Sequence, residues 1–234
     1  MGGTIDKTLL VLLIKFLYPC LQWTARVGLI VIKMETQSAR KILSLIDEAW
    51  NGIEFIADER NDFSLALLDI SFDHCKSILF LCENGLFASA YALARPMYEC
   101  FIRGAWIQHC ATSKQIEKIK EKDEFPLTLR NMVKNVESKT KWPKALSNMM
   151  EYLINNMHSY THGGVQIVAR RFDGGNMVHL PDTEEINALY RFLLIISFVA
   201  FTETLSISGI KNKNKDMNNI YSLIIDQHFK NIPL

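Results

Sequence analysis

The sequence predicts an all-α protein: an up-and-down bundle of four to five main helices with a small irregular or hairpin lobe. Apolar residues recur at helical spacing along most of the chain, which is the main sign of amphipathic helices. The 234 residues include only 11 Gly and 6 Pro, and this scarcity of turn residues indicates few, long elements. Strand-like alternation occurs in one place, the stretch VQIVARRFDGGNMVHL at 165–180.

The composition limits the functional classes. Apolar residues make up 49% of the chain and charged residues 22%, as in a globular protein. The net charge of +1 gives no general attraction for nucleic acid, so RNA binding would need a local cationic patch, and no DNA-specific motif is present. The five cysteines include no C-x-x-C pair, which disfavours a disulfide framework or a zinc knuckle and indicates a reducing, cytoplasmic location.

Residues 1–33 are predicted to be an apolar N-terminal extension outside the core. The run TLLVLLIKFLYPCLQW is interrupted by Lys15 and Pro19 and is shorter than the roughly 20 apolar residues of a membrane span. Two interpretations remain open: a surface-packed or frayed amphipathic segment, or an upstream extension to a chain that starts at Met34. Membrane contact by residues 1–33 is less favoured. We expect this extension to be dispensable for the fold.

The helical bundle is expected over 34–210. Its first helix is predicted at about 36–59, followed by a break at ERNDFS with Asp62 as the N-cap. A second helix then ends at Asn84-Gly85, and this tight turn predicts antiparallel packing with the next helix. That third helix, at 86–111, is apolar on nearly every side and should be central, with Pro96 as a kink or local break.

The second half of the chain continues the helical pattern. We expect a short helix at 127–139 and another that opens at Pro143 and stops at Gly163-Gly164. A hairpin turn is plausible at 173–176, and a capping box at 182–185 should start a buried core helix at 183–208. Residues 211–234 are predicted to be a basic linker and a short C-terminal helix.

The first candidate site is the set Arg95, Glu99 and Arg103. Their spacing of four residues places all three on one face of the third helix, with Tyr98 beside them as a candidate hydrogen-bond donor. The simplest interpretation is an Arg–Glu–Arg ion ladder at the bundle surface. The functional one is a cationic cleft, in which Glu99 orients two guanidiniums for a phosphate or a carboxylate.

The second candidate site is the stretch NNMHSYTHGGVQIVARR at 155–171. It provides five candidate ligand contacts: His158, Tyr160, His162, Arg170 and Arg171. His162 stands in the last turn of a helix, where the helix dipole favours the charged imidazole, so we expect it at the centre of the site. His158 and His162 have the spacing of metal ligands, but nothing else supports zinc, so neither a metal nor another cofactor is expected.

A further pattern, Arg103-x5-His109, fits the Arg-x4–6-His spacing of a family of ribonucleases, although such a spacing is common by chance. The stretches GLFASAYALARPMYECFIRGAWI and SYTHGG resemble uncharacterised bacterial helical proteins at the edge of the HEPN superfamily. The resemblance covers about 40–210 and rests on the Ala90/Leu93/Arg95/Glu99 helix and the Tyr160–Gly163 motif.

The resemblance implies a metal-independent RNase, acting as a toxin or antiviral effector and assembling as a homodimer. His162 or His109 would then be the general acid or base on a ribose 2′-hydroxyl, and Arg95 and Arg103 would stabilise charge on the phosphate. The alternative is a non-catalytic helical interaction or ligand-sensing module that uses the same cationic pocket. Convergence of the site residues in an open cleft would favour the RNase, and closure in mutual ion pairs would favour the module.

Overall fold

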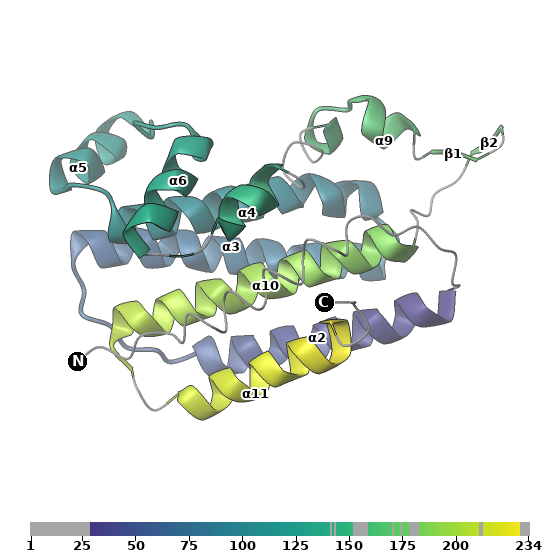
Figure 1. Cartoon of the computed structure of the whole chain (residues 1–234), viewed down its shortest axis with the longest axis horizontal. Helices are drawn as coiled ribbons and strands as arrows, with labels where there is room; N and C mark the ends of the chain where they lie inside the picture. The colour runs from purple at the N-terminus through teal and green to yellow at the C-terminus, as the bar shows by residue number, and fades with distance from the viewer. Residues whose placement is uncertain are drawn as a thin grey trace.

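The computed structural model describes residues 29–140, 142, 144–151, 159–169, 171–173, 175–177, 183–210 and 213–229. It confirms the all-α prediction. The long helices α2 (Leu29–Trp50), α3 (Glu59–Glu83), α4 (Phe87–His109) and α10 (Thr183–Ser208) run along the long axis of the molecule (Figure 1). Helix α10 packs against α2, α3 and α4, so it is the central helix that connects the other three.

Helix α2 differs from its prediction at both ends. It begins at Leu29, so residues 29–33 of the predicted extension are helical, and it ends at Trp50 instead of continuing to 59. The stop follows from Asn51-Gly52, because Gly52 has a φ of 72°, which favours glycine. Residues 1–28 lie outside the described part of the chain.

The N-cap of α3 is Asp58, and the prediction of Asp62 is wrong. The Asp58 side chain accepts from the backbone N–H groups of Arg60 and Asn61 at 2.9 Å, whereas Asp62 lies inside the first turn. The predicted end of this helix is confirmed, since Asn84 is the C-cap and Gly85 has a φ of 73°. Helix α4 begins two residues later and packs along α3.

A small residue allows α3 and α4 to approach closely. A Cβ atom added at Gly104 of α4 would lie 3.0 Å from the Ser64 carbonyl oxygen and 3.2 Å from the Leu68 side chain. The Ser64 hydroxyl donates to the Gly104 carbonyl at 2.9 Å, and the Ser71 hydroxyl donates to the Met97 carbonyl at 2.8 Å. These bonds satisfy buried hydroxyls inside an otherwise apolar contact.

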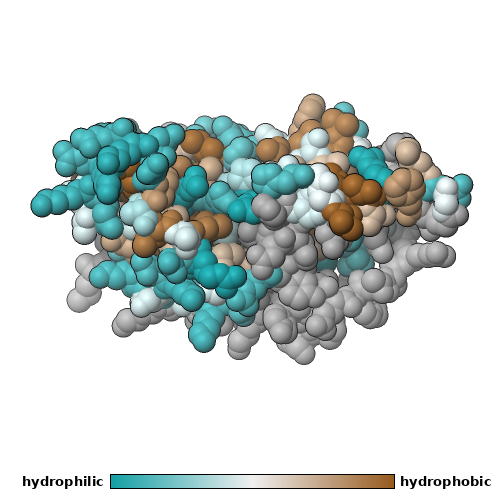
Figure 2. All heavy atoms as spheres, turned by 90° about the horizontal axis from the view of Figure 1, so that it is seen from above, coloured by the Kyte–Doolittle hydropathy of each residue, from teal (hydrophilic) through white to brown (hydrophobic). Residues whose placement is uncertain are grey.

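Four shorter helices of the described part follow α4 in the chain, and the second of them packs against it. They are α5 (Ser113–Lys122), α6 (Leu129–Thr140), α7 (Ala145–Met149) and α9 (Val165–Ala169). The predicted hairpin is confirmed: β1 (Phe172–Asp173) pairs antiparallel with β2 (Asn176–Met177). Seen from above, the molecule has mostly hydrophilic side chains at its α5 end and a group of apolar side chains at its α9 end (Figure 2). Four of the exposed apolar side chains belong to this second end: Val165, Val168, Phe172 and Met177.

The prediction of a buried core helix at 183–208 is confirmed by α10, which ends before Gly209 with its φ of 70°. It is the one described helix long and apolar enough to cross a membrane, and 94% of its most apolar window is buried inside the protein. Its arginine, Arg191, is also buried and pairs with Glu184 at 3.4 Å. Asp182, the first residue of the predicted capping box, lies outside the described residues.

The C-terminal part, α11 (Asn214–Ile224) and the π-helical turn η2 (Ile225–Phe229), packs against α2. Buried His228 makes the polar contact: its Nδ1 lies 2.8 Å from the Glu35 carboxylate and its Nε2 lies 2.8 Å from the Ser38 hydroxyl. This contact joins the first and last described helical segments.

Candidate ligand-binding site on helix α4

Arg95, Glu99 and Arg103 form the ion ladder that their spacing predicts. Arg95 Nε lies 2.8 Å from Glu99 Oε1, and Arg103 Nη2 lies 3.6 Å from Glu99 Oε2. The three side chains are 30%, 21% and 37% exposed, so the ladder is partly open to solvent. We call these residues, with Ala92 one turn earlier, the α4 stripe, because the spacing places them along one face of the helix.

An aromatic ring holds one end of the α4 stripe. The Arg103 guanidinium lies over the ring of Phe125, 4.7 Å from the centroid, in the segment that links α5 to α6. Arg103 Nε is buried and has no hydrogen-bond partner among the described residues, so this edge of the guanidinium is closed to ligands. Arg103 Nη2, on the same edge of the guanidinium, faces Glu99.

Pro96 explains how the other end of the stripe is organised. The prediction at Pro96 was a kink or a local break, and helix α4 continues through this residue without a break. Proline has no backbone N–H, and the Ala92 carbonyl therefore lacks the partner that residue 96 would provide in a regular helix. The Thr161 hydroxyl lies 3.4 Å from this carbonyl and donates to it. A threonine of the SYTHGG motif thus docks at the position that the proline leaves open.

Aromatic stacking supports the same contact. The rings of Tyr160 and Tyr91 lie 4.8 Å apart with an interplanar angle of 24°, and both side chains are buried. Tyr160 is therefore a packing residue that fixes the turn on α4. This contact and the Thr161 hydrogen bond hold residues 159–164 against the first half of α4.

The paired glycines have a conformational reason. Gly163 has a φ of 66°, in the left-handed region. A Cβ at Gly164 would lie 2.4 Å from the Ser159 hydroxyl oxygen, and the Gly164 N–H donates to the Ser159 carbonyl at 2.7 Å. Glycine therefore suits both positions, Gly163 because of its φ and Gly164 because Ser159 lies close to it.

His162 is exposed on this turn. Because Thr161 docks on Ala92, the turn that carries His162 lies at the first end of the α4 stripe. Arg171 is half-buried after α9, and its backbone N–H donates to Val168 at 3.0 Å. His158 and Arg170, which were also predicted to contact a ligand, lie outside the described residues.

Tyr98 does not share the stripe with its neighbours. Its side chain is completely buried, and its hydroxyl donates to the Leu146 carbonyl at 2.7 Å. Burial raises the pKa of this phenol well above its ordinary value, so the hydroxyl stays protonated. The predicted role as a donor to a ligand therefore does not fit its position.

His109 has a partner of its own on another helix. Its Nε2 lies 2.7 Å from the Glu203 carboxylate of α10, and its ring meets Trp142 edge-on at a centroid distance of 6.4 Å. The Glu203 side chain is only 4% exposed. Glu203 was not among the predicted site residues, although a lone carboxylate in a long apolar helix is a recognisable sign of a buried polar contact.

The described residues offer no group of three or more His, Cys, Asp or Glu side chains arranged to hold a metal ion. The α4 stripe instead has two guanidiniums around one carboxylate, with a net charge of +1. An anionic ligand can bind here if a guanidinium releases Glu99 and pairs with the ligand instead.

Comparison with known proteins gives one finding. No curated protein and no solved structure matches the chain. A family model matches residues 68–229, most of the chain, and this range contains the α4 stripe, the docked turn and the His109–Glu203 pair. The chain therefore belongs to a family of unknown function, DUF6988.

Proposed function

We propose that the protein is a helical binding module whose α4 stripe receives a phosphate-bearing ligand, with RNA as the ligand class. The observation that carries this proposal is the Arg95–Glu99–Arg103 ladder, a partly exposed pair of guanidiniums. Arginine binds phosphate through its planar fork, and the resemblance to HEPN proteins points to RNA as the source of the phosphates. Binding without cleavage is favoured because both guanidiniums are already paired with Glu99.

The pairing has a chemical consequence for catalysis. A guanidinium that must first leave Glu99 is poorly prepared to stabilise charge that develops in a transition state. Phosphodiester cleavage also needs a general base and a general acid, and His109 already uses its Nε2 on Glu203. The ladder therefore suits recognition of a phosphate better than cleavage.

RNA cleavage is a second candidate function, favoured by exposed His162 on the turn docked at the stripe. In this mechanism, His162 removes the proton of a ribose 2′-hydroxyl, and the oxygen attacks the adjacent phosphorus. The bond to the 5′-oxygen breaks and this oxygen takes up a proton from solvent, which leaves a 2′,3′-cyclic phosphate and a 5′-hydroxyl. No metal takes part in this reaction.

Fluorescence anisotropy with a labelled single-stranded RNA tests the binding proposal at several salt concentrations. If Arg95 and Arg103 each contact one phosphate, the slope of log K against log salt is about −1.4, and each Arg→Gln change removes about 0.7 of it. Glu99→Gln should strengthen binding, because it releases both guanidiniums. Arg130→Gln is the matched control, since Arg130 is exposed and paired with one carboxylate, Glu151, outside the stripe.

Absence of RNA binding in low salt by both the wild-type protein and Glu99→Gln would contradict the proposal. Incubating the same RNA with the protein in EDTA distinguishes the second candidate. A 2′,3′-cyclic phosphate product that disappears in His162→Ala, while binding persists, would establish cleavage. RNA that is bound but not cleaved would support the proposal of a binding module.

A further inference from the structure

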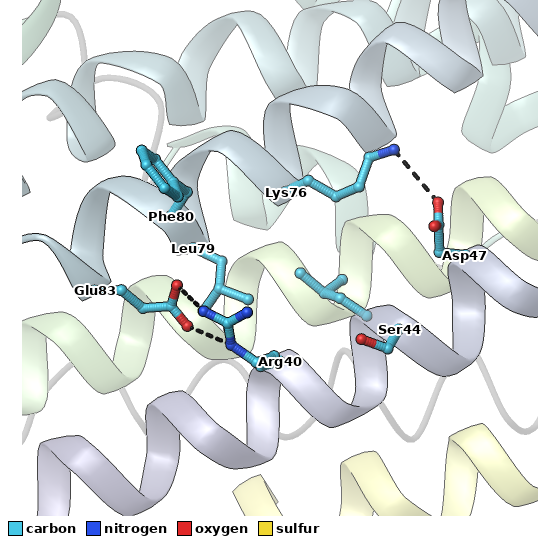
Figure 3. A pocket seen from close by; sticks show the side chains of 8 residues that line it. Arg40, Ser44, Asp47, Lys76, Leu79, Phe80 and Glu83 are labelled. Atoms are coloured by element: carbon cyan, nitrogen blue, oxygen red, sulfur yellow. Dashed lines mark hydrogen bonds and ion pairs between the residues drawn. The ribbon is translucent and has the colours of Figure 1, made fainter.

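Helices α2 and α3 border a groove on a different face of α3 from the one that packs on α4. The groove is a hollow of about 180 Å³ that is open to solvent. Eight residues line it, four from each helix: Arg40, Leu43, Ser44, Asp47, Lys76, Leu79, Phe80 and Glu83 (Figure 3). On each helix the lining positions follow the spacing of a single face, so the groove is a regular seam between two helices.

The two ends of the groove carry ion pairs. At one end, Arg40 Nε donates to Glu83 at 2.8 Å and Nη2 pairs with the second carboxylate oxygen (Figure 3). At the other end, Lys76 lies 3.3 Å from Asp47 and 3.0 Å from Asp73. The two pairs between the helices, Arg40–Glu83 and Asp47–Lys76, show that α2 and α3 run antiparallel, because the later residue of α2 meets the earlier residue of α3.

The charges at the two ends are not equivalent. Asp69 also lies near the Lys76 end, so this end has three carboxylates for one ammonium group and its net charge is negative. Burial, followed by the nearby Asp73 carboxylate, raises the pKa of Asp69, as expected where acidic groups crowd together. At the other end the Arg40 side chain is 64% exposed, and its Nη1 is not part of the pair with Glu83.

The middle of the groove is apolar, and it combines a hollow with one exposed phenylalanine side chain. Leu43 and Leu79 form a buried floor, whereas Phe80 is 63% exposed at the rim. A cavity of roughly 150 Å³ accommodates benzene, so the groove has the size for one phenyl ring. The surface therefore provides an aromatic ring, a hollow that fits such a ring, an exposed guanidinium edge of Arg40 at one end and a net negative charge at the other.

We propose that this groove is the docking surface for a second copy of the chain, in a two-fold antiparallel arrangement. Phe80 of each copy enters the groove of the other, and Arg40 of each copy faces Asp73 of the other. A two-fold interface requires a self-complementary patch, and the α2–α3 groove meets that requirement in shape and in charge. The proposal is independent of ligand binding at the α4 stripe.

Sedimentation velocity of the full chain at about 5 to 200 µM tests self-association, since a small interface of this kind is expected to be of micromolar strength. The wild-type protein should shift from monomer to dimer over this range. Phe80→Ala should raise the dissociation constant about tenfold or more, because a central aromatic anchor dominates such interfaces. Phe172→Ala is the matched control: this phenylalanine is similarly exposed, at 56%, and lies in the hairpin, so dimerisation should not change.

Charge reversal tests the arrangement itself. Arg40→Glu and Asp73→Arg should each abolish dimerisation alone, because each two-fold pair would bring like charges together twice. An equimolar mixture of the two variants should restore a dimer, since both cross-contacts then join opposite charges. Circular dichroism checks that each variant is folded. A monomeric wild-type protein at 200 µM, a Phe80→Ala dimer of unchanged strength, or a mixture that stays monomeric would overturn the proposal.

Discussion

His109 at the end of α4 and Glu203 near the end of α10 form a hydrogen-bonded pair, with Nε2 and the carboxylate oxygen 2.7 Å apart. Because Glu203 is almost fully buried, the histidine is needed to stabilise its charge. The pair joins the two central helices at one end of the bundle. It also keeps the Nε2 nitrogen of His109 away from the α4 stripe.

We predict that His109→Ala lowers the free energy of unfolding by roughly 3 kcal/mol, because it leaves a buried carboxylate without this partner. Glu203→Leu should cost less, since it removes the charge that needs a partner. Urea denaturation of both variants and of the double variant measures the coupling. Equal costs for the two single variants, with full additivity in the double variant, would contradict this account.

The contact between Thr161 and the Ala92 carbonyl should depend on Pro96. Thr161→Val removes the hydroxyl and should lower the stability by about 1 kcal/mol, the usual net value of a hydrogen bond. Thr161→Ser keeps the hydroxyl and is the matched control. In a Pro96→Ala background the helix provides its own donor to Ala92, so the effect of Thr161→Val should largely vanish. Chemical denaturation of the four variants tests this, and an undiminished effect in that background would show that Pro96 is irrelevant.

Gly104→Ala should destabilise the contact between α3 and α4 by about 1–3 kcal/mol, in the range of overpacked cores. The added methyl group meets the Ser64 carbonyl at 3.0 Å, and a backbone atom cannot move aside as a flexible side chain can. Alanine is the better helix former, so an exposed site would show the opposite sign. A rise in melting temperature would mean that the two helices are less closely packed than described.

The buried thiols should resist modification at neutral pH. Burial raises the pKa of Cys82 to about 12, and it raises the pKa of Cys75 still further. In the unfolded chain a thiol ionises near pH 8.5. The folded state therefore binds more protons above that pH, and stability should fall as pH rises from about 8.5 towards 12.

Two measurements check this prediction. In the native protein at pH 8, Ellman's reagent should react with Cys75 and Cys82 only at the rate of unfolding. The melting temperature should also decline above about pH 9, and less steeply in Cys82→Ala than in the wild-type protein after allowing for the loss of packing. Rapid native labelling of Cys82 would show that its surroundings open readily.

Much of the fold could be predicted because helical periodicity and local capping are encoded in adjacent residues. The end of α3 at Asn84-Gly85 and the span of α10 are confirmed for this reason. The predicted start of α3 was wrong because Asp58 and Asp62 are both plausible N-caps. Only the path of the chain before the helix selects between them. The start of α2 was set too late because its first turn lies within an apolar run without a cap signal.

The candidate site could be predicted only in part. The Arg95–Glu99–Arg103 ladder depends on spacing within one helix, so the sequence contains it. The pairing of His109 with Glu203 joins residues far apart in the chain, and no local pattern specifies which helices meet. Tyr98 was misplaced for a related reason: a position next to the stripe in sequence turns about 100° around the helix and faces the interior.

The enclosure of α10 by its neighbours has a consequence for the dynamics of the chain. Amide hydrogens of a helix surrounded on all sides exchange with solvent only when the whole bundle opens, whereas outer helices can open on their own. The exchange rates along α10 should therefore measure the global free energy of unfolding, while α5 and α11 should exchange through smaller local openings. Hydrogen–deuterium exchange would then distinguish a ligand that stabilises the entire protein from one that slows exchange only in the region around α4.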